Sequence, residues 1–189
     1  MIGRRIAIVG VTCSGKSTLA RRLAERYGLK HISMDALHWD PGWKSPPEGV
    51  FRQRVDAATA APAWVTDGNY KEVRDLTWGR AEMLIWLDFP LWLTFWRLFR
   101  RTLKRILTRE DLFNGNRETW RGAFFSKDSL FLYSIKSHRL MRRAYPEAVA
   151  LPVYQHLQVV RLSSPAELDA WLVGLEPAGQ RQAAGERAE

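Results

Sequence analysis

The stretch GVTCSGKSTLA, residues 10–20, decides the fold of this chain. It matches the pattern G-x-x-x-x-G-K-[ST] at Gly10, Gly15, Lys16 and Ser17. In such a loop the glycines let backbone N–H groups wrap the phosphates of a nucleoside triphosphate, and the helix that follows directs its N-terminus at them. The stretch therefore predicts a phosphate-binding loop (P-loop) between a strand and a helix.

The flanking residues supply both elements. The short apolar run at residues 6–9 ends at the loop and predicts a buried strand over residues 4–9. After the loop, Leu19, Leu23 and Tyr27 recur on one face of a predicted helix, and Gly28 is its stop signal. A chance glycine and serine turn would not require this strand–turn–helix context.

The loop carries the predicted nucleotide site, with ATP and Mg²⁺ as the expected ligands. Lys16 is expected to reach the β and γ phosphates, and Ser17 to coordinate Mg²⁺. The predicted nucleotide-binding residues are Gly10, Val11, Thr12, Cys13, Ser14, Gly15, Lys16, Ser17 and Thr18.

Length and composition narrow the class of protein. The 189 residues suit a single domain, expected over residues 1–176, with residues 177–189 as a disordered tail. The single cysteine fits a reducing compartment, and no signal peptide is visible. The most apolar window, residues 83–99, is divided by Asp88 and Pro90 into halves too short for a bilayer span. We therefore expect a cytoplasmic protein without a membrane span. Its oligomeric state is not readable.

Strands and helices alternate along the chain, which predicts a parallel sheet with helices on both faces. Ser45 and Ser164 each begin a capping-box pattern before a helix. Strands are expected at residues 4–9, 30–35, 64–67, 83–87 and 157–162, and helices at residues 16–27, 46–60, 71–78, 90–107, 130–145 and 165–175.

Four residues fall at the carboxyl ends of predicted strands, where parallel sheets bind ligands: Gly10, Asp35, Asp67 and Asp88. Asp67 is expected to position Mg²⁺, or else to initiate a turn. Asp35 fits an acceptor ligand or a general base, or else a helix cap. Capping alone accounts for Asp88. These positions predict one active site.

The predicted helix over residues 90–107 combines an apolar stripe with many basic residues. A core-packing helix explains the stripe but not the number of arginines. A membrane surface or a transferring phosphoryl group explains both, and we favour the phosphoryl role for some of the arginines. The stripe is Trp92, Phe95, Trp96, Phe99, Leu103 and Ile106, and the basic residues are Arg97, Arg100, Arg101, Lys104 and Arg105.

Aromatic and histidine residues near the acceptor side give weaker signals. The aromatic residues could stack on a base or sugar, or pack in a core or lid: Trp39, Trp43, Tyr70 and Trp78. The histidines lack metal-ligand spacing and receive no role: His31, His38, His138 and His156.

Together these segments carry a resemblance. GVTCSGKST, ISMDALHWDPGW, WVTDGNY and IWLDFPLWLTFWRLFRRTLKR resemble the adenylate-kinase-like proteins known as DNA-topology-modulation (FlaR-related) kinases. More distantly, the chain is similar to nucleoside monophosphate, shikimate and gluconate kinases. The resemblance covers residues 6–175.

The resemblance implies a three-layer sandwich around a five-stranded parallel sheet, an acceptor-binding segment over residues 36–62 and a helical lid over residues 108–137. It also implies that a D-x-P strand end leads to two arginines at the nucleotide phosphates, here Arg97 and Arg101. Arg117, Arg139 and Arg142 are then lid candidates. The family's acceptor arginine after D-G is replaced here by Lys71, with Arg74 nearby.

Two functions remain open. The first is an ATP-dependent phosphotransferase acting on a small molecule, with a nucleoside monophosphate as one candidate and with Lys16, Arg97, Arg101 and Asp35 as catalytic residues. Ser17 and Asp67 would hold Mg²⁺. The alternative is a nucleotide-gated binding protein with weak ATPase activity, whose basic surface contacts DNA or another polyanion. The net charge of +9 suits both, and the lack of a DNA-binding motif favours the first.

Overall fold

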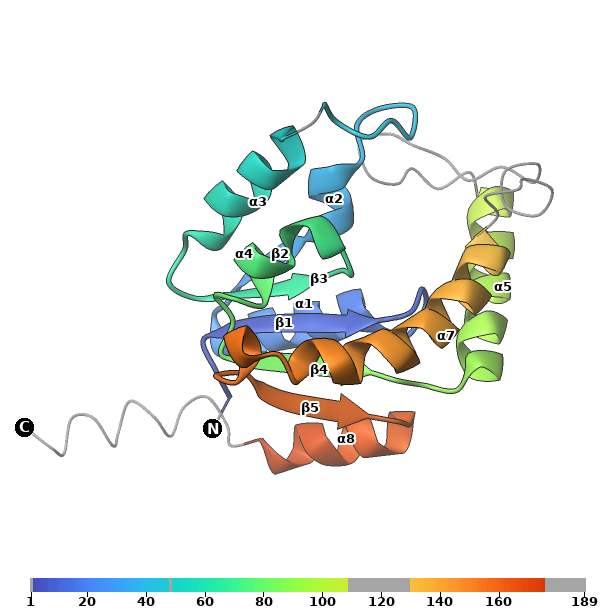
Figure 1. The fold of residues 1–189 in the computed structure, drawn as a ribbon. Coiled ribbons are helices and arrows are strands. Elements are labelled where there is room, and N and C mark those ends of the chain that lie inside the picture. The colour runs from blue at the N-terminus through green and yellow to red at the C-terminus, as the bar shows by residue number, and fades with distance from the viewer. Residues whose placement is uncertain (1, 48, 109–129, 176–189) are drawn as a thin grey trace, which may run out of the picture.

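The computed structural model describes residues 2–47, 49–108 and 130–175 (Figure 1). In this part of the chain five strands form one sheet in the order β2-β3-β1-β4-β5, and every pairing is parallel. Their carboxyl ends therefore share one edge of the sheet. The strands are β1 (Arg5–Gly10), β2 (Lys30–Ser33), β3 (Trp64–Asp67), β4 (Met83–Leu87) and β5 (Gln158–Leu162).

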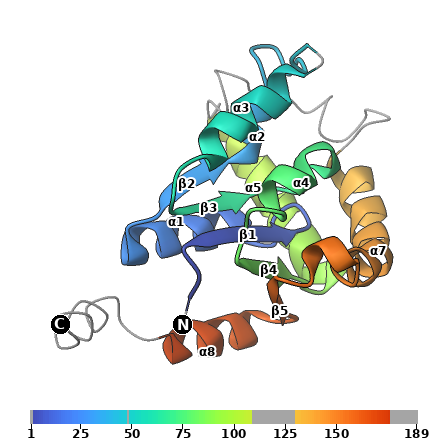
Figure 2. The same ribbon diagram turned by 60° about the vertical axis from the view of Figure 1, so that its left-hand side comes forward.

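Helices cover both faces of the sheet, as predicted for strands that are buried on two sides. Figures 1 and 2 show α1 and α8 on one face and α7 on the other. The helical elements are α1 (Lys16–Tyr27), α2 (Met34–His38), α3 (Val50–Thr59), η1 (Lys71–Val73), α4 (Arg74–Thr77), α5 (Leu91–Thr108), α7 (Leu130–Val149), η3 (Pro152–Tyr154) and α8 (Pro165–Gly174).

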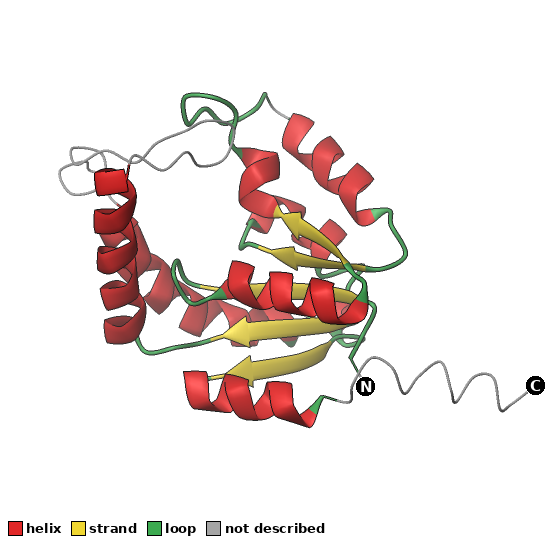
Figure 3. Cartoon of the chain, turned by 180° about the vertical axis from the view of Figure 1, so that it is seen from behind, coloured by secondary structure: helices red, strands yellow, loops and turns green. Residues whose placement is uncertain are grey.

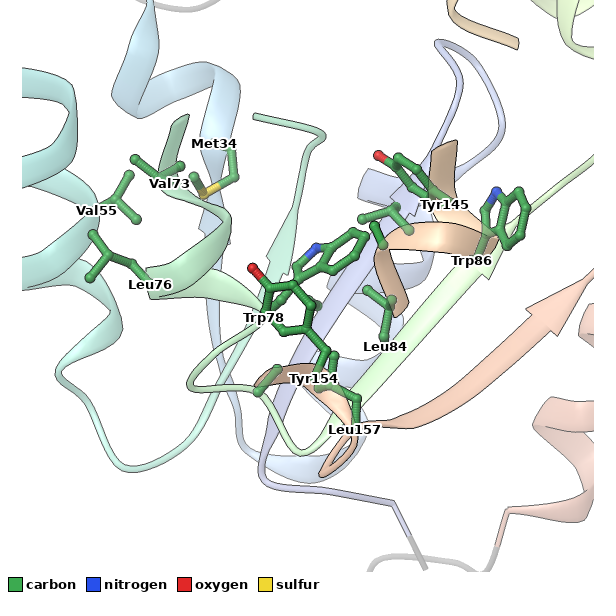
Figure 4. Close-up of a cluster of buried hydrophobic side chains, with 14 of the residues drawn as sticks. Met34, Val55, Val73, Leu76, Trp78, Leu84, Trp86, Tyr145, Tyr154 and Leu157 are labelled. Carbon is green, nitrogen blue, oxygen red and sulfur yellow. The ribbon is translucent and has the colours of Figure 1, made fainter. Parts of the chain in front are cut away.

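Alternate residues of the central strands supply two hydrophobic cores. Ile6 and Ile8 of β1 pack with Leu19 and Leu23 of α1. On the opposite face, the core joins strand residues to α3, α4, α7 and η3 (Figure 4), and includes Ala7, Leu84, Trp86, Val55, Trp78, Tyr145 and Tyr154. The cores hold the rigid sheet whose edge carries the P-loop.

Several element boundaries differ from expectation. β2 ends at Ser33 because α2 begins at once with Met34, and α7 continues through Pro146 to Val149. The capping box expected from Ser45 is wrong, since α3 begins at Val50 after Gly49, whose φ is +81°. The cause lies in the Pro46-Pro47 pair, because a residue before proline is kept out of the helical region. The capping box at Ser164 is confirmed, with Glu167 N–H donating to Ser164 Oγ at 3.1 Å.

The buried side of α5 is not its aromatic stripe. Thr94, Leu98 and Thr102, spaced four residues apart, face the protein, whereas Trp92 and Trp96 are exposed. Figure 3, from behind, shows α5 at the margin of the molecule beyond the carboxyl ends of the strands. The helix therefore packs through two threonines and Leu98, and its two tryptophans lie outside the core.

Two predicted segments fall largely or wholly outside the described residues. Of the predicted lid, residues 109–129 lie outside them and residues 130–137 begin α7. The expected tail, residues 177–189, also lies outside. No helix within the described ranges is long and apolar enough to cross a membrane.

Candidate active site

The P-loop connects β1 to α1 at the carboxyl edge of the sheet. Lys16 Nζ donates to the carbonyl oxygens of Gly10 at 2.8 Å and Val11 at 2.9 Å, so its ammonium lies within the curve of the loop. Thr18 is exposed in the first turn of α1. Ser14 is buried, and its Oγ has no hydrogen-bond partner in the described structure. The loop thus holds a cation and an unsatisfied hydroxyl at a helix N-terminus, where phosphate oxygens are favoured.

Asp67 links the P-loop helix to the sheet. Ser17 Oγ, at the start of α1, donates to Asp67 Oδ2, and Asp67 is only 5% exposed. His31 Nε2 of the neighbouring strand lies 3.1 Å from Asp67 Oδ1. The structure thus brings together the two residues predicted to hold Mg²⁺, and it adds His31, for which no role was predicted.

The donor set at Ser17 and Asp67 fits Mg²⁺. A hydroxyl and a carboxylate are hard oxygen ligands, and Mg²⁺ is commonly held by one or two carboxylates together with substrate phosphates. The described residues contain no group of three or more histidine, cysteine or acidic side chains that could hold a metal ion.

Asn69 ties the segment after β3 to the P-loop. Its Oδ1 accepts from Gly10 N–H at 3.0 Å, and its Nδ2 donates to the Gly10 carbonyl oxygen. Both backbone groups of this glycine are therefore held by one side chain from the segment after β3. Gly68 comes first, with a φ of +153°, and a Cβ there would lie 2.5 Å from Met34 Cβ. This turn sets the direction of Asn69.

The ammonium of Lys16 lies in a mixed electrostatic field. Burial is the largest effect and lowers its pKa from the usual value. The negative charges of Asp35 and Asp67, followed by the Cys13 thiol, act in the opposite direction, whereas the positive charge of Arg101 lowers the pKa further. Asp35 and Arg101 therefore lie close enough to Lys16 to act on it, although they come from α2 and α5.

The two arginines predicted on α5 are placed differently. Arg101 Nε is buried and has no hydrogen-bond partner among the described residues. Arg97, one turn earlier, places its guanidinium carbon 5.7 Å from the centre of the Phe89 ring. Arg101 is thus a cation with an unsatisfied donor near the P-loop, while Arg97 lies over the end of β4.

Asp35 and Tyr70 form a hydrogen-bonded pair that joins α2 to the turn after β3. Tyr70 O–H donates to Asp35 Oδ1 at 2.7 Å, and Asp35 is otherwise exposed. Burial first, then the charge of Asp35 and its hydrogen bond, raise the pKa of Tyr70 far above its usual value. The phenol thus remains a hydrogen-bond donor to this carboxylate across the physiological pH range.

An aromatic cluster stands next to this pair. The His38 ring lies 4.7 Å from Trp39, 4.8 Å from Phe51 and 4.7 Å from Tyr70, measured between ring centroids. Trp39 also contacts Trp43, at 5.7 Å. These contacts join α2, α3 and the turn after β3 into one wall. Trp78, in contrast, is 3% exposed and belongs to the core.

Arg74 packs against aromatic rings. Its guanidinium carbon lies 4.3 Å from the centre of Trp78 and 5.4 Å from that of Tyr145. Lys71, which stands where the resemblance implies an arginine for the acceptor, is exposed on η1. Neither cation contacts Asp35 directly through a hydrogen bond or ion pair recorded among the described residues.

Asp88 is an ion-pair centre, not the expected helix cap. It is 4% exposed, and its carboxylate accepts from Arg142 Nε at 2.7 Å and from Arg161 Nε at 3.0 Å. Arg161 also lies over Trp86. Arg142, a predicted lid residue, is thereby held at the end of β4, whereas Arg139 is exposed and Arg117 lies outside the described residues.

Comparison with solved structures identifies the architecture. A shikimate kinase from Acinetobacter baumannii, in complex with shikimate, is 18% identical, with a TM-score of 0.51 over 90% of this chain and 89% of that one. A shikimate kinase from Bacteroides thetaiotaomicron is 14% identical, with a TM-score of 0.53 over 92% of this chain and 100% of that one. The chain has the P-loop kinase fold. No family model matches the chain, and no curated protein does either.

Proposed function

We propose that this protein is an ATP-dependent phosphotransferase whose acceptor is a small molecule bearing a hydroxyl group. The observation that carries the proposal is the geometry at the P-loop, where Lys16 Nζ lies 2.8 Å from the Gly10 carbonyl oxygen and Ser17 Oγ donates to the buried carboxylate of Asp67. A cation in the P-loop, a carboxylate beside a serine hydroxyl, a second cation and an acceptor-side carboxylate are the groups that phosphoryl transfer requires. The kinase names of the solved structures that share this fold agree with it.

On this proposal, Lys16 and Arg101 balance the charge on the transferring phosphoryl group, and Arg97 assists from one turn away. Ser17 and Asp67 would hold Mg²⁺, which neutralises phosphate charge when bound. The nucleotide phosphates lie along residues 10–18. His31 and Asn69 act as positioning residues, since they orient Asp67 and Gly10 through the contacts described above.

Asp35 is the proposed general base. The acceptor oxygen attacks the γ-phosphorus, its proton passes to the Asp35 carboxylate, and the bond from the γ-phosphorus to the β–γ bridging oxygen breaks to release ADP. Tyr70, which donates to one carboxylate oxygen, orients Asp35 and leaves the other oxygen for the acceptor. Residues 36–62 supply the aromatic wall of the acceptor site.

The charges on the acceptor side favour an acceptor without a phosphate group. Tyr70 and Tyr133 both have raised pKa values, first through burial and then through the negative charges of Asp35 and Glu72. Two carboxylates here would repel a nucleoside monophosphate. We therefore place neutral sugars and polyols before hydroxy acids and nucleoside monophosphates, which are anions. The FlaR-related resemblance and a cytoplasmic location remain part of this proposal.

The test is ADP release from Mg-ATP with each acceptor class in turn. One class should stimulate release well above the background without acceptor, and Lys16→Ala should abolish it. Lys30→Ala, an exposed lysine at the far end of β2, is the matched control and should behave as the wild type. Asp35→Asn should lower kcat by about 10²–10⁴-fold. Stimulation by no class, or full turnover by Lys16→Ala, would refute the proposal.

A further inference from the structure

The outer side of α5 is an apolar surface on a basic helix. We name it the α5 surface and define it as Trp92, Phe95, Trp96, Leu103 and Leu107 with the flanking Arg100 and Lys104. Trp92 is 72% exposed, Trp96 55% and Leu107 69%, which are high values for side chains of this size. Exposed apolar residues gathered at helical spacing mark a binding surface more often than scattered ones do.

The three sides of α5 have separate roles. At 3.6 residues per turn, the α5 surface lies roughly 140° around the axis from the packed side formed by Thr94, Leu98 and Thr102. Arg97 and Arg101 lie on a third side, about as far from the α5 surface in the other direction. The exposed tryptophans are therefore neither core residues nor part of the proposed phosphoryl site, and the site leaves them unexplained.

The charge of α5 is of one sign. Residues 91–108 contain no aspartate or glutamate, and Arg100 and Lys104 are exposed beside the apolar stripe. A helix with tryptophan and leucine on one side and arginine and lysine along its margin has the composition of helices that lie in the headgroup region of anionic membranes. Tryptophan rings prefer that interface, and each basic side chain near the surface adds electrostatic attraction.

We propose that the α5 surface docks on an anionic lipid bilayer, with the helix lying in the plane of the headgroups. Two other occupants fit the surface less well. In a symmetric pair of copies, Arg100 and Lys104 would meet their own equivalents with no acidic residue on α5 to pair with them. Nucleic acid could use the basic margin and stack on Trp92 and Trp96, but Leu103 and Leu107 at the other end of the surface offer no ring for a base. This proposal does not rest on the phosphotransferase activity.

The test is flotation of the full-length protein with vesicles of phosphatidylcholine alone or mixed with phosphatidylglycerol. We expect binding to the mixed vesicles only, weakening as salt is raised. Trp92→Ser/Trp96→Ser should weaken binding at least about tenfold through lost apolar burial. Arg100→Gln/Lys104→Gln should weaken it about 30-fold, at roughly fivefold per charge.

Matched controls distinguish binding through the α5 surface from nonspecific binding through any exposed apolar or basic side chain. Val173→Ser removes an apolar side chain on α8 that is 86% exposed, and Arg21→Gln/Arg22→Gln removes two exposed charges on α1. Both should bind vesicles as the wild type does, and all variants should keep the wild-type melting temperature within a few degrees. Equal loss in the controls would overturn the proposal.

Other occupants give distinct results. Concentration-dependent dimerisation in light scattering that Trp92→Ser/Trp96→Ser abolishes, without vesicle binding, would assign the surface to a second copy. Binding to a DNA oligonucleotide but not to vesicles would assign it to nucleic acid. Either result overturns the lipid proposal.

Discussion

Replacing Gly10 by alanine tests how the P-loop is built. Gly10 has a φ of +153°, a conformation that side chains other than glycine rarely adopt. A Cβ at this position would lie 2.6 Å from Ser14 Oγ and 2.7 Å from the carbonyl oxygen of Leu87. The second contact is with the backbone of β4, which cannot rotate away. The loop itself would have to move.

The cost follows from two effects. The backbone strain of such a conformation is about 1–3 kcal/mol, and forcing extra volume into a packed position adds about 1–3 kcal/mol. The expected loss in the free energy of unfolding is thus about 2–6 kcal/mol for Gly10→Ala. Movement of Gly10 would also disturb its contacts with Asn69 and Lys16. ATP affinity should then fall at least about 100-fold, the loss expected when two hydrogen bonds to charged phosphate oxygens are not made.

The assay is urea denaturation followed by circular dichroism, with ATP titration calorimetry beside it. Gly28→Ala is the matched control, because Gly28 has a φ of +63° but open space where its Cβ would go. It should cost only about 1–2 kcal/mol and leave ATP affinity unchanged. If Gly10→Ala cost no more than Gly28→Ala and bound ATP normally, the described geometry of the loop would be refuted.

Three further changes have defined outcomes. Asp88→Ala should lower the free energy of unfolding by about 2–3 kcal/mol, as measured by urea denaturation. This loss is smaller than that for breaking a fully buried ion pair, because Arg142 and Arg161 are half exposed. Burial raises the pKa of Tyr145 to about 12. The unfolded chain therefore loses this proton first, and the free energy of unfolding should fall between pH 10 and pH 12. Tyr145→Phe should lessen that slope by about 1.4 kcal/mol per pH unit, and an unchanged slope would contradict the assignment. His31→Ala should raise the Mg²⁺ concentration needed for half-maximal ATP turnover about tenfold, because His31 contacts a proposed metal ligand, Asp67. In His31→Gln the side-chain amide can still bond to Asp67, so the required Mg²⁺ concentration should rise less. Equal effects of the two substitutions would argue against hydrogen bonding.

Local patterns were sufficient for much of the fold. The P-loop predicted both β1 and α1, because the motif has meaning only between a strand and a helix. The apolar run before Asp88 predicted β4, and Ser164 with Glu167 predicted the start of α8, since both signals act within a few residues. Asp67 and Ser17 were predicted to share one site because ligands bind at the carboxyl ends of parallel strands, and the two side chains are hydrogen-bonded.

What the sequence did not predict depends on neighbours distant in the chain. The stripe on α5 had helical spacing, but spacing cannot say which side meets the sheet, and Thr94 and Thr102 proved to be the buried residues. Asn69 and His31 carry no motif, and their contacts arise only when β2, β3 and the P-loop are assembled. Asp88 looked like a cap because its arginine partners lie 54 and 73 residues away.

The most direct test of the central claim is the destination of the γ-phosphoryl group. Phosphorus NMR of a mixture of Mg-ATP, the protein and the stimulating acceptor distinguishes a new phosphate ester from inorganic phosphate. We expect one ester to form for each ADP released, with its formation abolished by Lys16→Ala and strongly reduced by Asp35→Asn. ADP matched only by inorganic phosphate, with or without acceptor, would contradict it.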